Sequence, residues 1–538
     1  AGIGGLLGGA QLRDAGWSAD QIRLVDKAGD VGGTWYWNRY PGAMCDVESY
    51  IYLPLLEETG FLPTEKYCHG PEILEHSRRI ARHYDLYERA VLGAAVTGAT
   101  WDEDDRRWTV TTDRGDALVC RYLIMANGPL QRPKLPGIDG VESFGGHSFH
   151  TSRWDYGYTG GDSDGGLVGL AGKRVAVIGT GATAVQCIPH LAEHAEHLYV
   201  FQRTPSSIDV RDNRTTDPDW AASLEPGWQR HRMENFNTLV SGGIAEEDLV
   251  DDGWTDIIGN LLIRLRDDGE DADLTPEGIR RTMELADFEK MEQIRARAQE
   301  LVDDPNVAES LKPYYRQFCK RPCFHDDYLP AFNRPNVTLV DTDGLGVSRV
   351  TEHGVVAPGP DGAVDEYEVD CIVYASGFEV GTSYTRRSGY DLVGRDGRTL
   401  SDHWDDGIRT MHGIFVHGFP NCFVMSQEQS GFTVNFPHRI DHQARHITQV
   451  LAAAAERDQP TIEVTAEAEA DWVQTIIDSA RMALSFLESC TPGYYNNEGR
   501  PAERAAQNGS YGGGSLGFFA IADAWLASGD YAGVTFSD

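Results

Sequence analysis

The feature that most constrains this chain is a complete glycine-rich turn in its interior. The segment KRVAVIGTGATAVQCIPHLA has an apolar run, Val175–Ile178, then Gly179, Gly181 and Ala184, and then small and apolar residues that favour a helix. This is the G-x-G-x-x-G/A pattern of a strand-to-helix turn, where bare backbone approaches a pyrophosphate at the helix N-terminus. We therefore expect a dinucleotide-binding βαβ unit, rather than a purely structural one. The contacts predicted from this turn are Gly179, Thr180, Gly181, Thr183, Ala184 and Gln186.

The end of the next strand indicates which dinucleotide binds. A second strand is predicted at Leu198–Phe201, and Arg203 and Thr204 follow it, where an NAD site would carry an acid. A cation and a hydroxyl there suit the 2′-phosphate of NADPH through charge-assisted hydrogen bonds. We therefore predict that NADPH binds here, with Arg203 and Thr204 at its phosphate.

An incomplete motif of the same kind opens the chain. Gly2 and Gly5 fit the back half of a G-x-G-x-x-G turn, and a helix is expected from about residue 5. A short strand, Ile22–Val25, then ends in Asp26, at the spacing where an acid binds ribose hydroxyls. The first glycine and its strand are missing, so we expect native residues to precede Ala1. The alternative on this segment alone is a glycine-rich tail.

Two dinucleotide sites in one chain suggest an electron relay from NADPH to a flavin, FAD. Two apolar strands that end in small-x-Gly, Tyr122–Gly128 and Cys371–Gly377, fit the crossings between two such domains. The predicted fold is α/β, with two Rossmann-like domains and a helical insertion. The predicted parts are an FAD domain at 1–140, a linker and NADPH domain at 141–210, a helical insertion at 211–316, the rest of the NADPH domain at 317–365 and the rest of the FAD domain at 366–538.

The linker carries the string that narrows the class. Phe144–Asp155 reads F-x-G-x-x-x-H-x-x-x-W-D, which resembles the fingerprint of the Baeyer–Villiger monooxygenases, flavoenzymes that insert oxygen beside a ketone carbonyl. The resemblance extends over nearly the whole chain. Its further matches are Gly32–Trp35, Arg39–Gly42 with Cys45 and Asp46, Lys320–Pro322 with Phe332–Arg334, and Gly418–Asn421. Cys490–Asn497 looks more like the members that act on bulky or large-ring ketones, and Tyr494 stands where others place a tryptophan near the nicotinamide.

The resemblance implies that NADPH and O2 convert a ketone into an ester or lactone through a C4a-peroxyflavin. A guanidinium beside the flavin would stabilise the peroxide and the oxyanion adduct, and Arg321 is the candidate, with Asp46 as its carboxylate partner. Lys320 is expected to reach the NADPH phosphate, and His150 and Trp154 to couple the domains. The other predicted cofactor contacts are Gly2, Gly5, Asp26, Gly33, Thr34, Trp35, Asp46, Tyr52, Val96, Asn435 and Tyr494.

Two other functions fit the same cofactors. An N- or S-oxygenating flavoenzyme uses the same flavin chemistry without needing Arg321. A non-catalytic FAD and NADPH redox sensor would bind both nucleotides without turnover.

Charge and cysteine content exclude several classes. The chain has 47 Lys and Arg against 83 Asp and Glu, a formal charge of −36 that disfavours nucleic acid and anionic membranes as partners. No apolar run approaches the ~18 residues that a membrane span requires. Nine scattered cysteines suggest a reducing compartment, the cytoplasm, without a disulfide framework.

Three further patterns resemble functional sites. His438, His442 and His446 share one helical stripe, but they lack companion ligands, so we expect a solvent- or flavin-facing side and no metal site. The G-x-S-x-G string at 513–517 lacks a preceding strand and is predicted to be a flexible loop. The glycine-rich stretch 157–172 is predicted to be a mobile linker.

Overall fold

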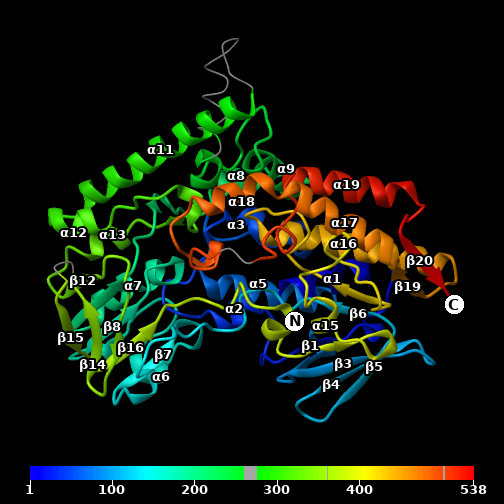
Figure 1. The fold of residues 1–538 in the computed structure, drawn as a ribbon, viewed down its shortest axis with the longest axis horizontal. Coiled ribbons are helices and arrows are strands. Elements are labelled where there is room, and N and C mark those ends of the chain that lie inside the picture. Colours follow the sequence, from blue (N-terminus) through cyan, green and yellow to red (C-terminus); the bar gives the residue numbers. More distant parts are fainter. Residues whose placement is uncertain (258, 260–274, 360–361, 501–502) are drawn as a thin grey trace.

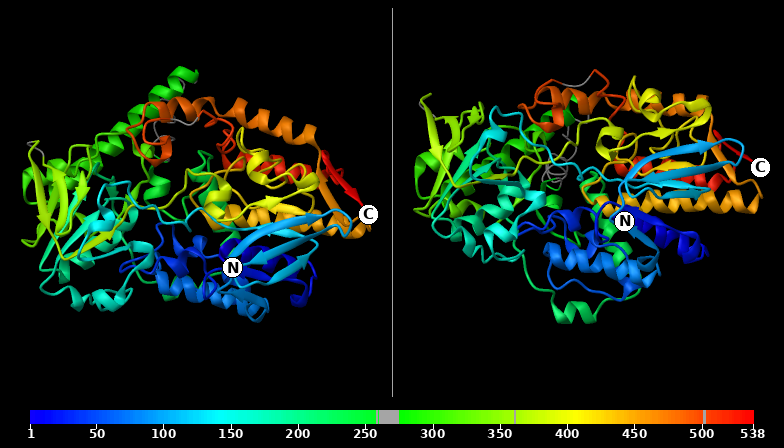
Figure 2. Two further views of the ribbon diagram at one scale, coloured as in Figure 1. Left: turned by 60° about the horizontal axis from the view of Figure 1, so that its bottom comes forward. Right: turned by 90° about the horizontal axis from the view of Figure 1, so that it is seen from below.

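The structure, a computed structural model, describes residues 1–257, 259, 275–359, 362–500 and 503–538. Two α/β domains lie side by side along the long axis of the molecule (Figure 1). The two domains can be told apart in both views of Figure 2, and helical segments extend from one to the other. This architecture agrees with the predicted α/β class and its two Rossmann-like domains. We call the part with the N-terminal motif the first domain and the part with the internal motif the second domain.

The second domain is built on a five-stranded parallel sheet. Its strand order is β12 (Val337–Asp341), β9 (His197–Gln202), β8 (Arg174–Ile178), β16 (Cys371–Tyr374) and β7 (His147–His150). Helix α7 (Ala182–His194) follows β8, and Val175 and Val177 are fully buried in the core beneath it. Helix α7 covers one face of the sheet, and the segment 349–369 covers the other. Because both faces are buried, the strands read as continuous apolar runs. The strands predicted at Val175–Ile178 and Leu198–Phe201 are confirmed as β8 and β9.

The sheet extends further along the chain than the predicted boundary at residue 366. Strand β16 pairs with β8 on one side and with β7 on the other, so Cys371–Tyr374 lies in the middle of the second domain's sheet. The prediction grouped this strand with the first domain because its apolar sequence ends in a small-x-Gly signal. That signal marks a crossing between domains but does not say to which sheet the strand before it belongs.

The first domain surrounds helix α1 (Ile3–Asp14), which packs on α16 (Phe436–Glu456) and α5 (Gly70–His83). Strand β1 (Leu24–Asp26) pairs in parallel with β2 (Ala90–Leu92), and β6 (Leu123–Met125) pairs with β18 (Cys422–Val424). Other elements of this domain are α2 (Thr34–Trp37), α3 (Ser49–Tyr52), α4 (Leu56–Thr59), α14 (Tyr384–Ser388), α15 (Leu400–His403), α17 (Ala466–Ser479), β19 (Thr461–Val464) and β20 (Val534–Ser537).

Each domain also carries a smaller sheet that the sequence did not predict: a mixed one in the first domain, where β17 pairs in parallel, and an antiparallel one in the second. In the first domain, Trp101 and Trp108 face each other across a strand pair and close a core of their own. Its strands are β17 (Leu392–Val393), β3 (Val96–Asp102), β4 (Arg107–Thr112) and β5 (Ala117–Cys120). The second domain adds β13 (Arg349–Val350), β14 (Gly354–Pro358) and β15 (Val364–Glu368).

The segment 211–316, predicted to be a helical insertion, is helical in the part that is described. It contains α8 (Pro218–Ala222), α9 (Trp228–Val240), α11 (Pro276–Leu301) and α12 (Pro305–Ser310). Three of these begin with a proline directly after a capping side chain, from Asp217, Thr275 and Asp304. The cap accepts free backbone N–H groups, and proline at the first position lacks an N–H that would need a partner.

Two predicted loops are instead ordered, so those predictions were wrong. The stretch 157–172 includes most of α6 (Tyr156–Thr159) and a 3₁₀ turn at Val168–Leu170, and buried Leu167 and Leu170 anchor it. The G-x-S-x-G string forms the start of α19 (Gly514–Ser528), where buried Ser515 donates a hydrogen bond to Asn237. A serine used in this way has no resemblance to a hydrolase nucleophile.

The histidine stripe of α16 also differs from its prediction. His442 lies 2.9 Å from Asp523, and His446 stacks on Trp525, so both face α19 rather than solvent or a flavin. Apolar packing around an uncharged imidazole explains the stripe. Among the described residues, no group of His, Cys, Asp and Glu is arranged to hold a metal ion.

Cysteine pairing is the clearest departure from expectation. Cys319 and Cys490 form a disulfide across a sequence separation of 171 residues. It joins the segment before Lys320 to the turn after α18 (Arg481–Glu488). The prediction failed because it treated widely spaced cysteines as unpaired.

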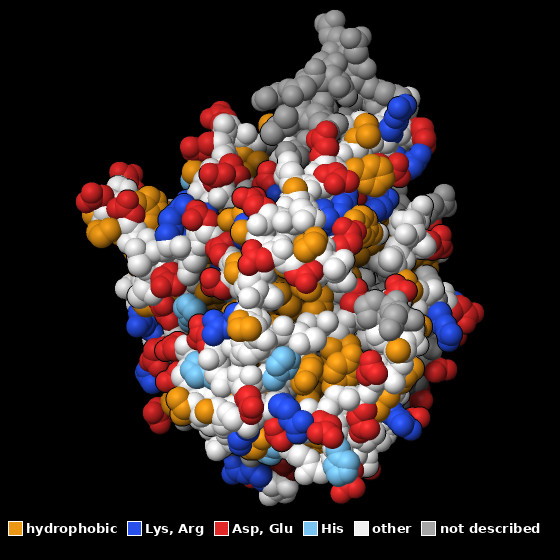
Figure 3. Space-filling model, turned by 90° about the vertical axis from the view of Figure 1, so that its left-hand side faces the viewer, with side chains coloured by type: hydrophobic (Ala, Val, Ile, Leu, Met, Phe, Trp, Pro, Cys, Tyr) orange, Lys and Arg blue, Asp and Glu red, His pale blue; other side chains and the backbone are white. Residues whose placement is uncertain are grey.

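The surface agrees with the charge of the chain. Acidic side chains are spread over much of the face shown in Figure 3, with basic ones interspersed. In the described part of the chain, no helix combines the length and the apolar character that crossing a bilayer demands.

Candidate active site between the two domains

The start of α1 forms a cradle made of bare backbone. Gly2 caps the helix and has no side chain to occupy its free N–H groups. Gly33 approaches it so closely, at φ +52°, that a Cβ on Gly33 would lie 2.7 Å from the Cα of Gly2. Asp26, at the end of β1, accepts a hydrogen bond from the backbone N–H of Ala28 at 2.9 Å. Uncapped helix amides above a closely packed glycine pair can bind a phosphate.

A cavity of about 2350 Å³ opens from this cradle. Single small-molecule sites usually measure roughly 300–1,000 Å³, so this one can hold a dinucleotide and a second ligand. Arg321 lines it together with most of the predicted flavin contacts. Those contacts are Gly2, Gly5, Asp26, Gly33, Thr34, Trp35, Tyr52 and Val96.

Asn435, predicted to contact the flavin, is held by the protein itself. It precedes α16, is fully buried, and donates a hydrogen bond from Nδ2 to the backbone oxygen of Ile51 at 2.9 Å. Its Oδ1 has no hydrogen-bond partner within the described part of the chain, and the residue is not among those that line the cavity. The glycine cradle and the size of the cavity are therefore the features that fit FAD.

The second glycine-rich turn is also built for close approach. Gly179 adopts φ +113°, and a Cβ there would lie 2.6 Å from the backbone oxygen of Ala375. Gly181 caps α7 without a side chain, and Thr180 Oγ1 donates to the backbone oxygen of Thr204 at 3.0 Å. Thr183 and Ala184 lie in the first turn of the helix, as predicted.

Gln186 has a different setting from the one predicted. Its Oε1 accepts a hydrogen bond from Tyr40, and its Nε2 donates to the backbone of Met44 and to Asp46 Oδ1. These partners tie α7 to the loop of the first domain. Gln186 is thus a contact between the domains, and the geometry does not direct it at a dinucleotide phosphate.

Two cations gather beside the second turn. Burial lowers the pKa of Lys320, and the charge of Arg203 lowers it further. Arg203 Nη2 pairs with Glu498 at 2.9 Å, and Lys320 Nζ donates to the backbone oxygen of Pro492 at 3.0 Å. The predicted phosphate pair therefore converges, with the C-terminal segment against it. Tyr494 begins a 3₁₀ turn in that segment, but its side chain lies outside the described residues.

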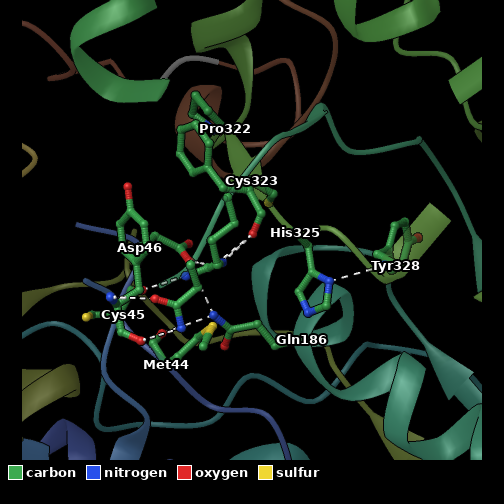
Figure 4. Close-up of polar contacts among 12 residues, drawn as sticks. Met44, Cys45, Asp46, Gln186, Pro322, Cys323, His325 and Tyr328 are labelled. Carbon is green, nitrogen blue, oxygen red and sulfur yellow. Dashed lines mark hydrogen bonds and ion pairs between the residues drawn. The ribbon is translucent and has the colours of Figure 1, made fainter. Parts of the chain in front are cut away.

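Asp46 contacts Arg321 where the two domains meet, and Figure 4 shows Asp46 with its polar contacts beside Cys45 and Gln186. Arg321 Nη1 donates to Asp46 Oδ2 at 2.6 Å, although the residues are 275 positions apart. Burial would raise the pKa of Asp46, but the charges of Arg211 and Arg321 outweigh it and hold that pKa below its ordinary value. Burial alone would lower the pKa of Arg321, yet Asp46 raises it, so the guanidinium stays charged. The predicted pair is thus in contact.

Arg211 also contacts Asp46, and the sequence did not reveal it. Its Nη2 pairs with Asp46 Oδ1, and its Nη1 donates to the backbone oxygen of Cys45 at 2.6 Å. It also donates to the backbone oxygen of Phe324 at 2.7 Å, where β10 (Ile208–Asp209) pairs with β11 (Cys323–Phe324). No motif marks this arginine. Two guanidinium groups share one carboxylate, so a positive charge remains uncompensated beside the cavity.

His150 and Trp154 of the linker do not reach Arg321. His150 Nε2 lies 2.9 Å from the backbone oxygen of Gly377, and burial lowers the pKa of His150 to about 4, which keeps the ring neutral. Trp154 donates to Thr159 at 3.0 Å and packs edge-on against Phe149. Both residues brace the crossing between the domains, in keeping with a coupling role.

Known proteins place this geometry in a family. The family model described as pyridine nucleotide-disulphide oxidoreductase matches residues 53–242. Neopentalenolactone D synthase of Streptomyces avermitilis is 58% identical, covering 99% of this chain and 89% of its own. Baeyer–Villiger monooxygenase ATR8 of Stachybotrys chlorohalonatus is 49% identical, covering 99% and 84%. The solved polycyclic ketone monooxygenase of Thermothelomyces thermophila is 40% identical, with a TM-score of 0.90 over 100% of this chain and 88% of that one.

The relatives indicate the same family as the two glycine-rich turns and the Arg321–Asp46 pair. The chain belongs to the Baeyer–Villiger monooxygenases, and it is an enzyme that uses FAD, NADPH and O2 to convert a ketone into an ester or lactone.

Proposed function

We propose that this enzyme acts on a bulky, multi-ring ketone and that Arg321, held by Asp46, is its catalytic cation. The observation that carries the substrate class is the apolar lining of the cavity. Four large side chains of that lining are well exposed, at 39–50%: Met283, Phe318, Phe432 and Tyr495. Apolar side chains exposed within one cavity favour a ligand with a large apolar surface.

The named relatives support this substrate class. One is a neopentalenolactone D synthase and another a polycyclic ketone monooxygenase, and both match nearly the whole chain. The C-terminal string Cys490–Asn497 points the same way, because it looks like that of members that act on bulky or large-ring ketones.

Arg321 is suited to stabilise negative charge on the substrate. Bound FAD, once reduced by NADPH, supplies the activation of O2. The Arg321 guanidinium lines the cavity and presents a fixed charge to the ketone oxygen as it becomes anionic. Asp46 orients the guanidinium, and Arg211 prevents Asp46 from cancelling its charge.

The cofactor contacts follow from the two cradles. We assign FAD to the cradle of Gly2, Gly5, Asp26 and Gly33. We assign NADPH to the turn at 179–184. Its 2′-phosphate is placed at Arg203, Thr204 and Lys320.

We place the enzyme in the cytoplasm, because its reaction consumes NADPH. Disulfides there are uncommon and mostly redox-active, so Cys319–Cys490 would cycle with the thiol pool. Trapping thiols in intact cells and then weighing the peptides would show both oxidised and reduced Cys490. A disulfide that stays fully oxidised would contradict this location.

A ketone panel tests the substrate class. Purified holoenzyme would be offered multi-ring, large-ring, simple cyclic and linear ketones, with lactone or ester measured by gas chromatography. We expect kcat/KM to be highest for multi-ring ketones. A preference for cyclohexanone or linear ketones would overturn the substrate class but not the family.

A further inference from the structure

One contact of the C-terminal segment is not explained by catalysis or by packing. The carboxylate of Glu498 pairs with Arg203 Nη2 at 2.9 Å and lies 3.8 Å from Lys134 Nζ. Arg203 is the residue assigned to the 2′-phosphate. An anionic side chain of the protein therefore lies on the cation that an anionic cofactor group is expected to use.

The residues just before Glu498 in the sequence hold it in that position. The segment starts at the Cys319–Cys490 disulfide, beside Lys320, and Pro492 accepts a hydrogen bond from Lys320. Asn496 donates back to the oxygen of Cys490 at 3.1 Å, which closes the segment on itself. The backbone N–H of Glu498 then donates to the oxygen of Gly493 at 2.7 Å.

The backbone at this point is also unusual. Asn497 and Glu498 adopt φ of +50° and +58°, the left-handed region, which is uncommon for a residue like glutamate. Such a conformation persists only where the surroundings impose it, and it often marks a functional position. Here it directs the carboxylate at Arg203.

We propose that Glu498 is a built-in competitor of the 2′-phosphate of NADPH. A carboxylate and a phosphate accept the same charge-assisted hydrogen bonds from a guanidinium, so they compete for Arg203. NADPH must displace Glu498, whereas NADH carries no phosphate and leaves the pair intact. Glu498 thus lowers the affinity for NADPH. This inference rests on the proposed assignment of Arg203 to the 2′-phosphate.

Binding of adenosine 2′,5′-bisphosphate to the FAD-loaded protein tests the proposal without turnover. Isothermal titration would compare wild type with Glu498→Gln, which keeps the shape of the side chain and removes its charge. An exposed ion pair is weak, so we expect binding to tighten by about 1.4- to 5-fold, which corresponds to about 0.2–1 kcal/mol. Glu488→Gln removes the same charge from an exposed position at the end of α18 and is expected to change nothing.

Arg203→Ala separates this inference from the site on which it rests. The substitution should weaken binding of the bisphosphate, and adding Glu498→Gln in that background should then have no effect. If Arg203→Ala weakens binding but Glu498→Gln does not tighten it, Glu498 is not a competitor and the phosphate site stands. If Arg203→Ala leaves binding unchanged, the phosphate is bound elsewhere and both proposals fall.

Discussion

Asp46 and Glu498 each pair with arginine, and the two carboxylates differ in burial. Asp46 is only 4% exposed and contacts both Arg211 and Arg321. Glu498 is 39% exposed and its partner Arg203 is 46% exposed. Breaking a buried pair leaves an unsolvated charge, whereas breaking an exposed pair returns both groups to water. The first pair is therefore a fixed part of the site, and the second can be exchanged for a ligand.

Removing the buried carboxylate should have the largest effect. Asp46→Asn leaves Arg211 and Arg321 facing each other without an anion, and we expect the free energy of unfolding to fall by about 3–5 kcal/mol. Asp212→Asn is the matched control, because it removes a carboxylate from the exposed pair with Arg214. Thermal unfolding of the FAD-loaded proteins measures both. If both variants lost the same small amount of unfolding free energy, the fold would not depend on a buried charge at Asp46.

Removing the exposed cation should affect cofactor choice and not stability. Arg203→Ala loses a charge-assisted hydrogen bond of about 1.5–3 kcal/mol to the 2′-phosphate. We expect the KM for NADPH to rise by about 10- to 100-fold and the KM for NADH to change little. Steady-state oxidation of each cofactor measures this. A parallel rise for both cofactors would mean that Arg203 acts through the shape of the site.

Arg211 should set the acid sensitivity of the buried pair. Arg211 and Arg321 lower the pKa of Asp46 in the folded state, so Asp46 stabilises the fold above its unfolded pKa and loses that effect as the pH falls through its folded pKa. Arg211→Gln raises the folded pKa, so the loss should begin at a higher pH than in wild type. Melting temperatures between about pH 3 and 7 would show the shift.

Arg214→Gln provides the reference for this comparison, because it removes an exposed guanidinium three positions away in the sequence. Its melting temperatures should follow those of wild type across the same range. If the melting temperatures of Arg211→Gln and Arg214→Gln depend on pH in the same way, Arg211 does not lower the pKa of Asp46.

The sequence predicted the elements that depend on residues close together in the chain. The strand at Val175–Ile178, the turn at Gly179 and the helix after it depend on neighbouring residues, and the structure has them as expected. The Arg321–Asp46 contact was reached only through the family resemblance, since the two residues lie 275 positions apart.

What the sequence did not predict depends on distant segments meeting. Arg211 belongs to the site because β10 pairs with β11, which no local pattern announces. The disulfide forms because Cys490 lies beside the segment that carries Lys320. The sheet to which β16 belongs is set by its two neighbouring strands, β8 and β7, which its own sequence does not indicate. Each of these is a fact about packing and not about a motif.

The central claim is that Arg321 serves oxygen insertion and not flavin reduction. Its most direct test is the amount of lactone formed per NADPH consumed, measured with the best ketone of the panel, in wild type, Arg321→Ala and Arg321→Lys. For wild type we expect close to one lactone formed for each NADPH consumed. In the alanine variant the lactone rate should fall by about 10²–10³-fold, while NADPH is still consumed, more slowly, and hydrogen peroxide accumulates. Lysine should restore only part of the product, because it keeps the charge without the planar fork. An alanine variant that forms lactone at nearly the wild-type rate would contradict the account.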